Sequence, residues 1–424
     1  MSIAVVKGKV SNAGSEDLLT ASVFGRLRYL PYNNYLKPIL ELSRNLSDDT
    51  FTLTPLNGMP NIEFWPTKYK REPDIELSTD TTKLFIEVKF HSSKSGEEEH
   101  DQLANQYEDL CNDLDNKKAK EGVIIYLTKD RVMPEVDLNN SIENITKKDL
   151  KGDFRKNLYW LSWFDIWEFL SNQIEDIDSA RDKTIVQDII DLLNKQGLKH
   201  FTGFSAAEFK GNINSPNHTS TIMDSPKENL RNAFQMVQKT LEETSVLIKD
   251  FEGELLNKEN GLISLHNGTE IGTESSNSVN VGEKWLKKFV MRYYLPKKHE
   301  HSYKHLLGIS VAYNFEAEPN ESPKLILGII DNSLIKQNKE KYYYWWIPFL
   351  YASKSLHKYE PNVSSRSELK AGTWYKVDPS PSEKHHIPLF ESGHLYFVDL
   401  LDVKSKADVK NLAVELKCKY EALN

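Results

Sequence analysis

The sequence predicts an α/β (α+β) fold with a mixed central sheet flanked by helices, followed by a second α+β domain. Up to about residue 204, short apolar runs alternate with amphipathic segments, a pattern typical of a sheet with helices packed on its faces. Residues 209–226 are rich in Asn, Ser, Thr, Pro and Gly and predict a linker. We therefore expect a first domain at 1–204, a linker at 205–226 and a C-terminal recognition or sensor domain at 227–424.

Each element of the first domain has its own signal. SEDLLTASVFGRLRYL predicts a helix with Ser15 as its N-cap and an apolar face. The runs PDIEL and KLFIEVKF, on either side of the turn STDTT, predict a β-hairpin. The other expected elements are a helix over 101–120, a continuous apolar strand over 122–128, a strand over 157–163 and a helix over 180–197 that ends at Gly197.

The second domain combines two predicted helices with β-type runs. A long amphipathic helix is expected over 227–256, and a final helix over 406–423. Between them lie the five runs LLGISVAYNFEA, KLILGIID, YYYWWIPFLYA, TWYKVD and HLYFVDLLDV.

Composition excludes several classes of protein. No apolar run among the 424 residues approaches the roughly 18 residues of a membrane span, and the N-terminus lacks the apolar core of a secretory signal. Cys111 and Cys418 are too few and too far apart for a disulfide framework or a cysteine zinc site. We therefore expect a cytoplasmic protein without membrane contact. The net charge of −8 does not exclude nucleic-acid binding, because local basic patches can serve inside an acidic chain.

Two charges interrupt the apolar strand LFIEVKF. Alternation directs Leu84, Ile86, Val88 and Phe90 to one face and Phe85, Glu87 and Lys89 to the other. If helices cover both faces, a lone Glu87 costs several kcal/mol or shifts its pKa. A divalent metal compensates for this cost, since hard cations bind carboxylate oxygens, and Asp74 on the neighbouring strand supplies a second carboxylate. The alternative is an exposed cross-strand ion pair between Glu87 and Lys89 on a half-solvated sheet.

Pro73-Asp74 followed by Glu87-Val88-Lys89 resembles the motif of the PD-(D/E)XK nuclease superfamily, which has a restriction-endonuclease-like fold. The resemblance covers about residues 15–130. It implies a hairpin on which Asp74, Glu87 and the Val88 backbone carbonyl bind Mg²⁺ or Mn²⁺. Lys89 would then orient or deprotonate the attacking water and stabilise transition-state charge.

Two flanking helices extend the resemblance. The helix before the hairpin offers Glu16 as a ligand of a second ion, with Asp17 as the competing candidate and an ordinary first-turn acid as the alternative. The helix after it offers Gln102, for which the alternative is a solvated helix face. The related nucleases place Gln and Tyr four residues apart, whereas Gln102 and Tyr107 are five apart, and Tyr107 also belongs to an apolar stripe.

Candidate contacts to nucleic acid lie in two segments. His91, at the end of the motif strand, and Lys94, in the loop after it, are near the predicted site. The densest basic segment interleaves cations with tyrosines, which suits a nucleic-acid surface but also a half-buried amphipathic helix. Its candidate residues are Lys287, Lys288, Arg292, Lys297 and Lys298. Glu76 shares the strand phase of Asp74 and is expected on the solvated surface.

The resemblance implies an Mg²⁺-dependent phosphodiester hydrolase that cuts double-stranded DNA, an endonuclease of bacterial anti-phage or restriction-type defence. Two other functions stay open: an RNase with the same site, and a catalytically silent nucleic-acid-binding or regulatory protein on the same fold. A homodimer and an activator or partner protein of a defence system are further expectations from the habits of such nucleases.

Overall fold

The computed structural model describes residues 16–90, 101–115, 121–146, 153–204, 226–256, 261–264, 272–273, 289–296, 305–313, 322–331, 370–377 and 393–423. The chain divides into two compact units, Met1–His200 and Phe201–Asn424. The predicted linker at 205–226 lies outside the described residues except for Pro226, which begins a helix. Phe201 and Phe204, which the sequence assigns to the first domain, pack in the core of the second unit.

The first unit is built on a five-stranded sheet in the order β1-β2-β3-β4-β5. The first three strands pair antiparallel, whereas β3 pairs parallel with β4 and β4 parallel with β5. The sheet is therefore mixed, as the sequence predicts, and β3 is the strand at which the direction changes. The strands are β1 (Asn61–Phe64), β2 (Ile75–Ser78), β3 (Thr82–Lys89), β4 (Glu121–Thr128) and β5 (Leu158–Ser162).

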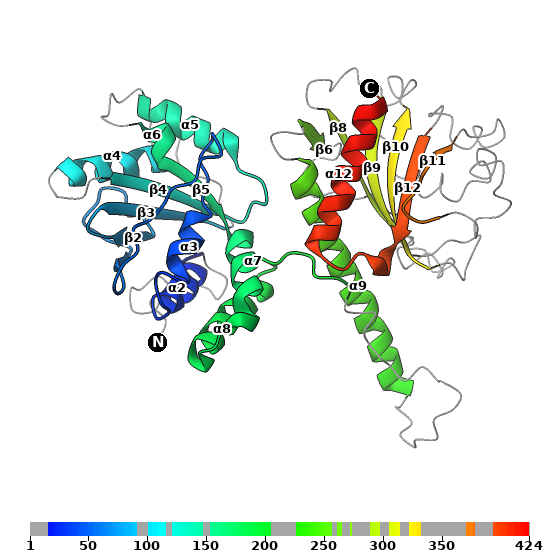
Figure 1. Ribbon diagram of the computed structural model, residues 1–424, viewed down its shortest axis with the longest axis horizontal. Helices are drawn as coiled ribbons and strands as arrows, with labels where there is room; N and C mark the ends of the chain where they lie inside the picture. Colours follow the sequence, from blue (N-terminus) through cyan, green and yellow to red (C-terminus); the bar gives the residue numbers. More distant parts are fainter. Residues whose placement is uncertain are drawn as a thin grey trace. The chain divides into compact units, whose positions relative to one another are not determined.

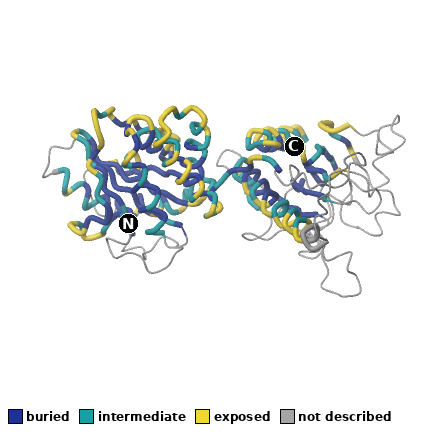
Figure 2. The backbone as a smooth tube through the Cα atoms, turned by 90° about the horizontal axis from the view of Figure 1, so that it is seen from below, coloured by how far each residue is buried: buried dark blue, intermediate teal, exposed yellow. Residues whose placement is uncertain are grey.

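Helices cover both faces of this sheet (Figure 1). One face carries α2 (Glu16–Leu27), α3 (Leu36–Glu41), α7 (Trp163–Gln173) and α8 (Ala180–Lys195). The other carries α4 (Gln102–Asp115), α5 (Glu135–Thr146) and the short α6 (Phe154–Asn157). The sheet is consequently buried between two hydrophobic cores, which Figure 2 shows as dark blue strands. In the described residues, no helix is long and apolar enough to cross a bilayer.

The predicted alternation along β3 is confirmed. Leu84, Ile86 and Val88 are buried in the core under α2 and α8, while Phe85 is buried in the core under α4. Glu87 therefore faces the covered α4 side of the sheet, and its side chain is only 2% exposed. A half-solvated sheet with an exposed Glu87–Lys89 pair does not describe this strand.

Element ends follow local chemistry. The strand predicted over 157–163 ends at Ser162, because the Ser162 hydroxyl accepts from the Phe164 amide and the Asp165 carboxylate accepts from the Ser162 amide. This reciprocal capping starts α7 at Trp163. Gly197 ends α8 with φ 72°, a left-handed conformation that glycine adopts without steric cost.

The second unit contains a seven-stranded sheet with antiparallel pairs. Six of its strands follow the order β11-β12-β10-β9-β8-β6, and β7 pairs with β8 outside this order. The two long helices α9 (Pro226–Leu255) and α12 (Lys406–Leu423) share one core with these strands, and they match the two predicted helices. The strands are β6 (Leu262–Ser264), β7 (Gly272–Thr273), β8 (Phe289–Pro296), β9 (His305–Ala312), β10 (Lys324–Asp331), β11 (Trp374–Val377) and β12 (Gly393–Asp399), and the run YYYWWIPFLYA lies outside the described residues.

Candidate functional site

Four charged side chains meet where β3 ends. Glu87 and Lys89 are among the last three residues of β3, and Asp74 immediately precedes β2. Because Ile75 pairs with Ile86 across the hairpin, Asp74 lies beside Glu87. The first residue of α2, Glu16, reaches the same end of β3. The structure thus brings together the Asp, Glu and Lys of the predicted motif and the predicted acid from the preceding helix.

Both carboxylate oxygens of Asp74 accept hydrogen bonds. The Val88 amide donates to Oδ2 at 2.8 Å, and the indole Nε1 of Trp65 donates to Oδ1 at 3.1 Å. The Trp65 amide also donates to the Asp74 carbonyl at 3.0 Å. Sequence reasoning did not identify Trp65, which directly follows β1 and belongs to no recognised motif.

The Glu87 carboxylate is held from two sides. Lys89 Nζ donates to Oε1 at 2.5 Å, and the side-chain amide of Gln106 on α4 donates to Oε2 at 2.7 Å. The amide that contacts Glu87 is therefore that of Gln106, about one helical turn after Gln102. Gln106 lies on the same apolar stripe of α4 as Leu103 and Tyr107, and a polar residue on that stripe is the signal that could have identified it. The role of Gln102 stays a prediction.

Glu16 closes the site at the end of β3. Its Oε2 accepts from the Phe90 amide at 2.5 Å, and its Oε1 lies 3.8 Å from Lys89 Nζ. An acid in the first turn of a helix needs no such partner, so this long-range contact supports Glu16 as a residue of the site.

The electrostatics of the cluster favour binding of a cation. Burial raises the pKa of Asp74 well above its usual range, and the nearby Glu87 raises it further, although the Val88 amide and Lys89 oppose this. Burial also raises the pKa of Glu87, against the lowering effects of Lys89 and Gln106. Burial lowers the pKa of Lys89, but Glu87, Asp74 and Glu16 outweigh it, so the pKa is raised overall. Both carboxyl groups are thus costly to bury in their charged form, and a divalent cation beside them would offset that cost.

The residues present fit a divalent ion in donor chemistry. Asp74 and Glu87 supply carboxylate oxygens, which Mg²⁺ and Mn²⁺ prefer, and the buried Oε1 of Gln106 has no hydrogen-bond partner among the described residues. Within the described part of the chain, no three His, Cys, Asp or Glu side chains are gathered as a metal site. A bound ion would therefore take two carboxylates plus backbone or water oxygens. The Val88 carbonyl as a ligand stays a prediction.

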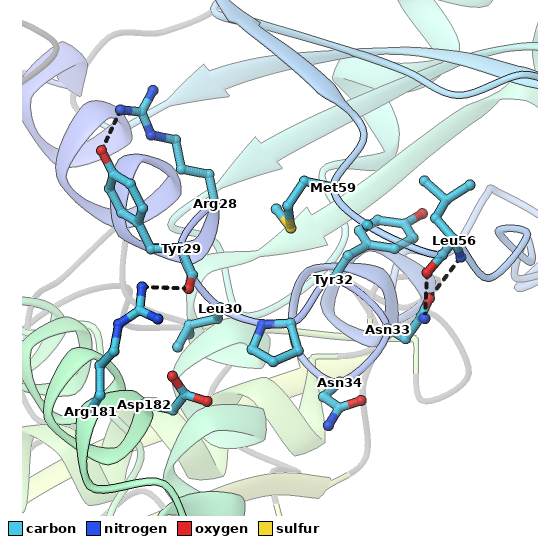
Figure 3. A pocket seen from close by; sticks show the side chains of 12 residues that line it. Arg28, Tyr29, Leu30, Tyr32, Asn33, Asn34, Leu56, Met59, Arg181 and Asp182 are labelled. Atoms are coloured by element: carbon cyan, nitrogen blue, oxygen red, sulfur yellow. Dashed lines mark hydrogen bonds between the residues drawn. The ribbon is translucent and has the colours of Figure 1, made fainter.

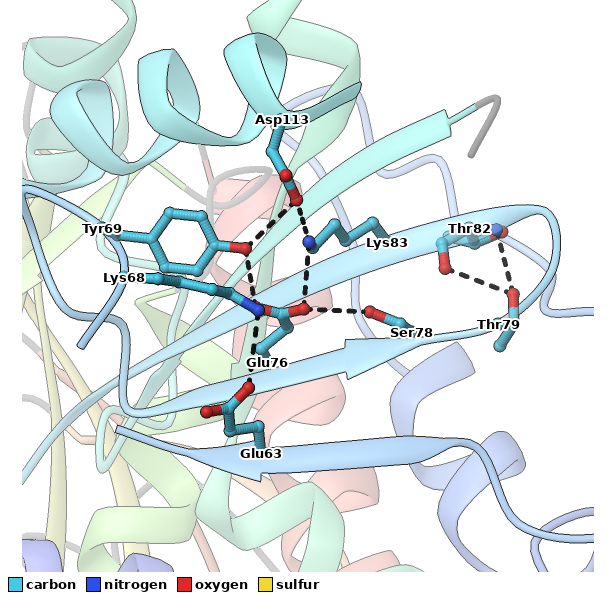
Figure 4. A network of polar contacts seen from close by, with 9 residues as sticks. All are labelled: Glu63, Lys68, Tyr69, Glu76, Ser78, Thr79, Thr82, Lys83 and Asp113. Carbon is cyan, nitrogen blue, oxygen red and sulfur yellow. Dashed lines mark hydrogen bonds and ion pairs between the residues drawn. The ribbon is translucent and has the colours of Figure 1, made fainter. Parts of the chain in front are cut away.

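The sequence predicts Glu76 on the solvated surface, and this prediction is wrong. Glu76 is buried in an ion-pair network on the face of the sheet that also carries Glu87 (Figure 4). Its carboxylate lies 3.0 Å from Lys83 Nζ and 2.7 Å from Lys68 Nζ, and it accepts from the Tyr69 hydroxyl at 2.7 Å. Lys83 also pairs with Asp113 of α4. These contacts lower the pKa of Glu76 despite its burial, so Glu76 is a structural partner of Lys83.

The predicted nucleic-acid contacts fall mostly outside the described residues, namely His91, Lys94, Lys287, Lys288, Lys297 and Lys298. Arg292 is described, and the prediction is wrong for it. It is 3% exposed within β8, and its guanidinium Nε donates to Glu252 of α9 at 2.8 Å. Tyr293 and Tyr294 are also buried, so this part of the segment is neither a surface nor an amphipathic helix.

A hollow of about 420 Å³ lies beside the turn between α2 and α3 (Figure 3). None of Asp74, Glu87 and Lys89 lines it. The guanidinium of Arg28 contacts the Tyr29 hydroxyl at 2.6 Å, and Arg181 at the start of α8 donates to the Tyr29 carbonyl at 3.3 Å. Asp182 lines the same hollow. Its polar groups are thus mainly engaged with one another.

Comparison with known proteins gives a distant relative. An uncharacterized protein of Pasteurella multocida (strain Pm70), PM0110, is 28% identical to this chain over 173 residues. The match covers 38% of this chain and 61% of that protein. No family model matches the chain, and no solved structure matches it.

Proposed function

We propose that the protein is a metal-dependent nuclease that hydrolyses DNA phosphodiester bonds at the Asp74–Glu87–Lys89 site. The observation that carries the proposal is the meeting of these three side chains with Glu16 at the end of one buried strand. Charges so placed are costly to bury, and a cluster of acids with raised pKa values is typical of a functional site.

The arrangement of strands supports the same proposal. A helix with Glu16, the antiparallel hairpin β2–β3, helix α4 with Gln106 and a parallel strand β4 follow one another in the order that the PD-(D/E)XK resemblance implies. The mixed sheet is compatible with a restriction-endonuclease-like core, which we propose for the domain predicted at 1–204.

Phosphodiester hydrolysis requires an activated water and neutralisation of charge on the phosphoryl oxygens. An ion held by Asp74 and Glu87 would neutralise phosphoryl charge and make water a better nucleophile. Lys89, which contacts Glu87 and lies 3.8 Å from Glu16, would orient the attacking water and donate to the developing negative charge. Gln106 donates to the second oxygen of the Glu87 carboxylate. This bond fixes the orientation of the carboxylate, and with it the direction of the lone pairs that remain for an ion.

We propose double-stranded DNA as the substrate and anti-phage or restriction-type defence as the setting, in a cytoplasmic enzyme that pairs to cut both strands and whose basal activity a partner protein raises. These parts rest on the resemblance. An RNase activity uses the same site and is the second candidate. A silent protein on this fold would not need the complete set of Asp74, Glu87, Lys89 and Glu16 that converges here.

The experiment incubates the full chain with plasmid DNA and, separately, with RNA, in Mg²⁺, in Mn²⁺ and in EDTA. We expect cleavage of DNA with a divalent ion, none in EDTA, and loss of cleavage in Asp74→Ala and Lys89→Ala. Lys183→Ala is the matched control, because Lys183 forms an exposed pair with Glu175 far along the chain. Wild type that cuts neither substrate, or variants at Asp74 and Lys89 that cut as well as the control, would overturn the proposal.

A further inference from the structure

Trp65 holds the residue that we propose as a metal ligand at two points. Its amide donates to the Asp74 carbonyl at 3.0 Å, and its indole Nε1 donates to Asp74 Oδ1 at 3.1 Å. Trp65 itself is 3% exposed and belongs to the core between the sheet and α2. A buried aromatic ring with a fixed backbone therefore determines where one oxygen of Asp74 lies.

The backbone of Trp65 is strained. Its φ is 48°, in the left-handed region that bulky L residues avoid. In the described part of the chain, Asp48 is the other non-glycine residue with a positive φ. Such a conformation persists only where surrounding contacts determine it, and here it accompanies the double contact to Asp74 and the tilted packing on Phe64.

The indole bond completes the orientation of the carboxylate. The Val88 amide fixes Oδ2 and Trp65 fixes Oδ1, so the plane of the Asp74 carboxylate cannot rotate without loss of a hydrogen bond. Each oxygen keeps a second lone pair that can contact an ion. Hydrogen bonds of this kind to ligating carboxylates commonly change metal affinity by about 10–100-fold when they are removed.

We propose that Trp65 is a positioning residue for the metal site, which orients Asp74 for a divalent ion through its indole N–H. The inference rests on the proposed metal site, but it does not require that the substrate be DNA. It assigns a function to a residue outside the motif and explains why a strained tryptophan lies at the end of β1.

The test measures Mn²⁺ binding by calorimetry on the full chain without nucleic acid. Trp65→Phe keeps an aromatic ring in the core and removes the N–H. Trp167→Phe is the matched control, because it removes a comparable indole bond, Trp167 Nε1 to Asn194 Oδ1 at 2.8 Å, on α7 and α8. We expect Trp65→Phe to weaken Mn²⁺ affinity by about 10-fold or more and Trp167→Phe to leave it within about twofold.

Equal Mn²⁺ affinities of Trp65→Phe and wild type would overturn the inference, and so would a wild type that binds no Mn²⁺. Wild type that binds Mn²⁺ through Asp74 but cuts no nucleic acid would instead overturn the proposed function alone. If Trp65→Phe does not fold, an NMR titration of wild type with Mg²⁺ tests the inference instead, through the indole ¹⁵N–¹H signals. The Trp65 signal should shift on addition of Mg²⁺ while the Trp167 signal stays, and an unmoved Trp65 signal contradicts the proposal.

Discussion

Gln106 of α4 donates its side-chain amide to the carboxylate of Glu87 on β3 across 2.7 Å, and this bond joins a helix to the charged end of the strand. Both side chains are almost fully buried. Water therefore cannot easily replace the lost donor, and in the described part of the chain Lys89 is the other donor to the Glu87 carboxylate.

Replacement of this glutamine should reduce cleavage. Gln106→Met keeps the volume of the side chain but removes the donor to Glu87, so we expect the cleavage rate to fall by about 10-fold or more. Gln102→Met, one turn earlier on the same helix, is the comparison, and it should leave the rate within about twofold. The measurement is the initial rate of plasmid cleavage at saturating Mg²⁺. The opposite ranking of the two variants would favour Gln102, the glutamine that the resemblance offers.

The first turn of α2 allows a similar pairwise test. Glu16→Gln removes a negative charge 3.8 Å from Lys89, while Asp17→Asn removes the neighbouring charge from the same turn. We expect the cleavage rate to fall by about 10-fold in Glu16→Gln and to stay within about twofold in Asp17→Asn. Because Glu16 helps to raise the pKa of Lys89, the alkaline limb of the pH–rate profile should also move to lower pH in Glu16→Gln. An unmoved limb would show that Glu16 does not act on Lys89.

Acid should stabilise the metal-free site. The pKa of Asp74 is raised in the folded protein by burial and by Glu87, so its proton is bound more tightly in the folded than in the unfolded chain. Its contribution to stability is therefore present below the unfolded pKa and is lost as the pH rises through the folded pKa. Urea unfolding in EDTA should give a wild type that gains stability over Asp74→Asn as the pH falls from about 8 to about 5. A constant difference between the two proteins would contradict this.

Arg292 should matter for stability and not for nucleic-acid affinity. Its guanidinium is buried against Glu252, so Arg292→Ala removes the guanidinium partner of an acid whose pKa burial already raises. We expect the free energy of unfolding of the second unit to fall by about 3–5 kcal/mol. Urea unfolding measures this loss, and filter binding of duplex DNA below the transition should show unchanged affinity. A variant of normal stability that binds DNA more weakly would return Arg292 to the predicted surface.

Strand phase made much of the first unit predictable. The apolar alternation of Leu84, Ile86 and Val88 against Phe85 and Glu87 requires two covered faces, and the structure has both. A hairpin with a short turn then places Asp74 beside Glu87 whatever the rest of the fold does. These relationships are local, and local periodicity is what a single sequence records best.

The contacts that escaped prediction depend on packing between distant elements. Trp65 reaches Asp74 through a strained turn, which no residue pattern signals. Gln106 meets Glu87 because the rotation of α4 on the sheet turns this residue towards the strand. Arg292 looked like a surface cation because its partner Glu252 lies 40 residues earlier, on a helix whose position the sequence does not give.

The hairpin that carries Asp74, Glu87 and Lys89 forms from neighbouring residues, whereas Glu16 meets Phe90 across 74 positions of chain. Closing a loop of that length costs entropy and comes later than closing a hairpin. Three members of the cluster can therefore come together early in folding, and the fourth arrives only when α2 docks. If the protein is the proposed nuclease, recovery of cleavage during refolding would report the docking of α2, because a chain with only the hairpin formed lacks Glu16 at the site.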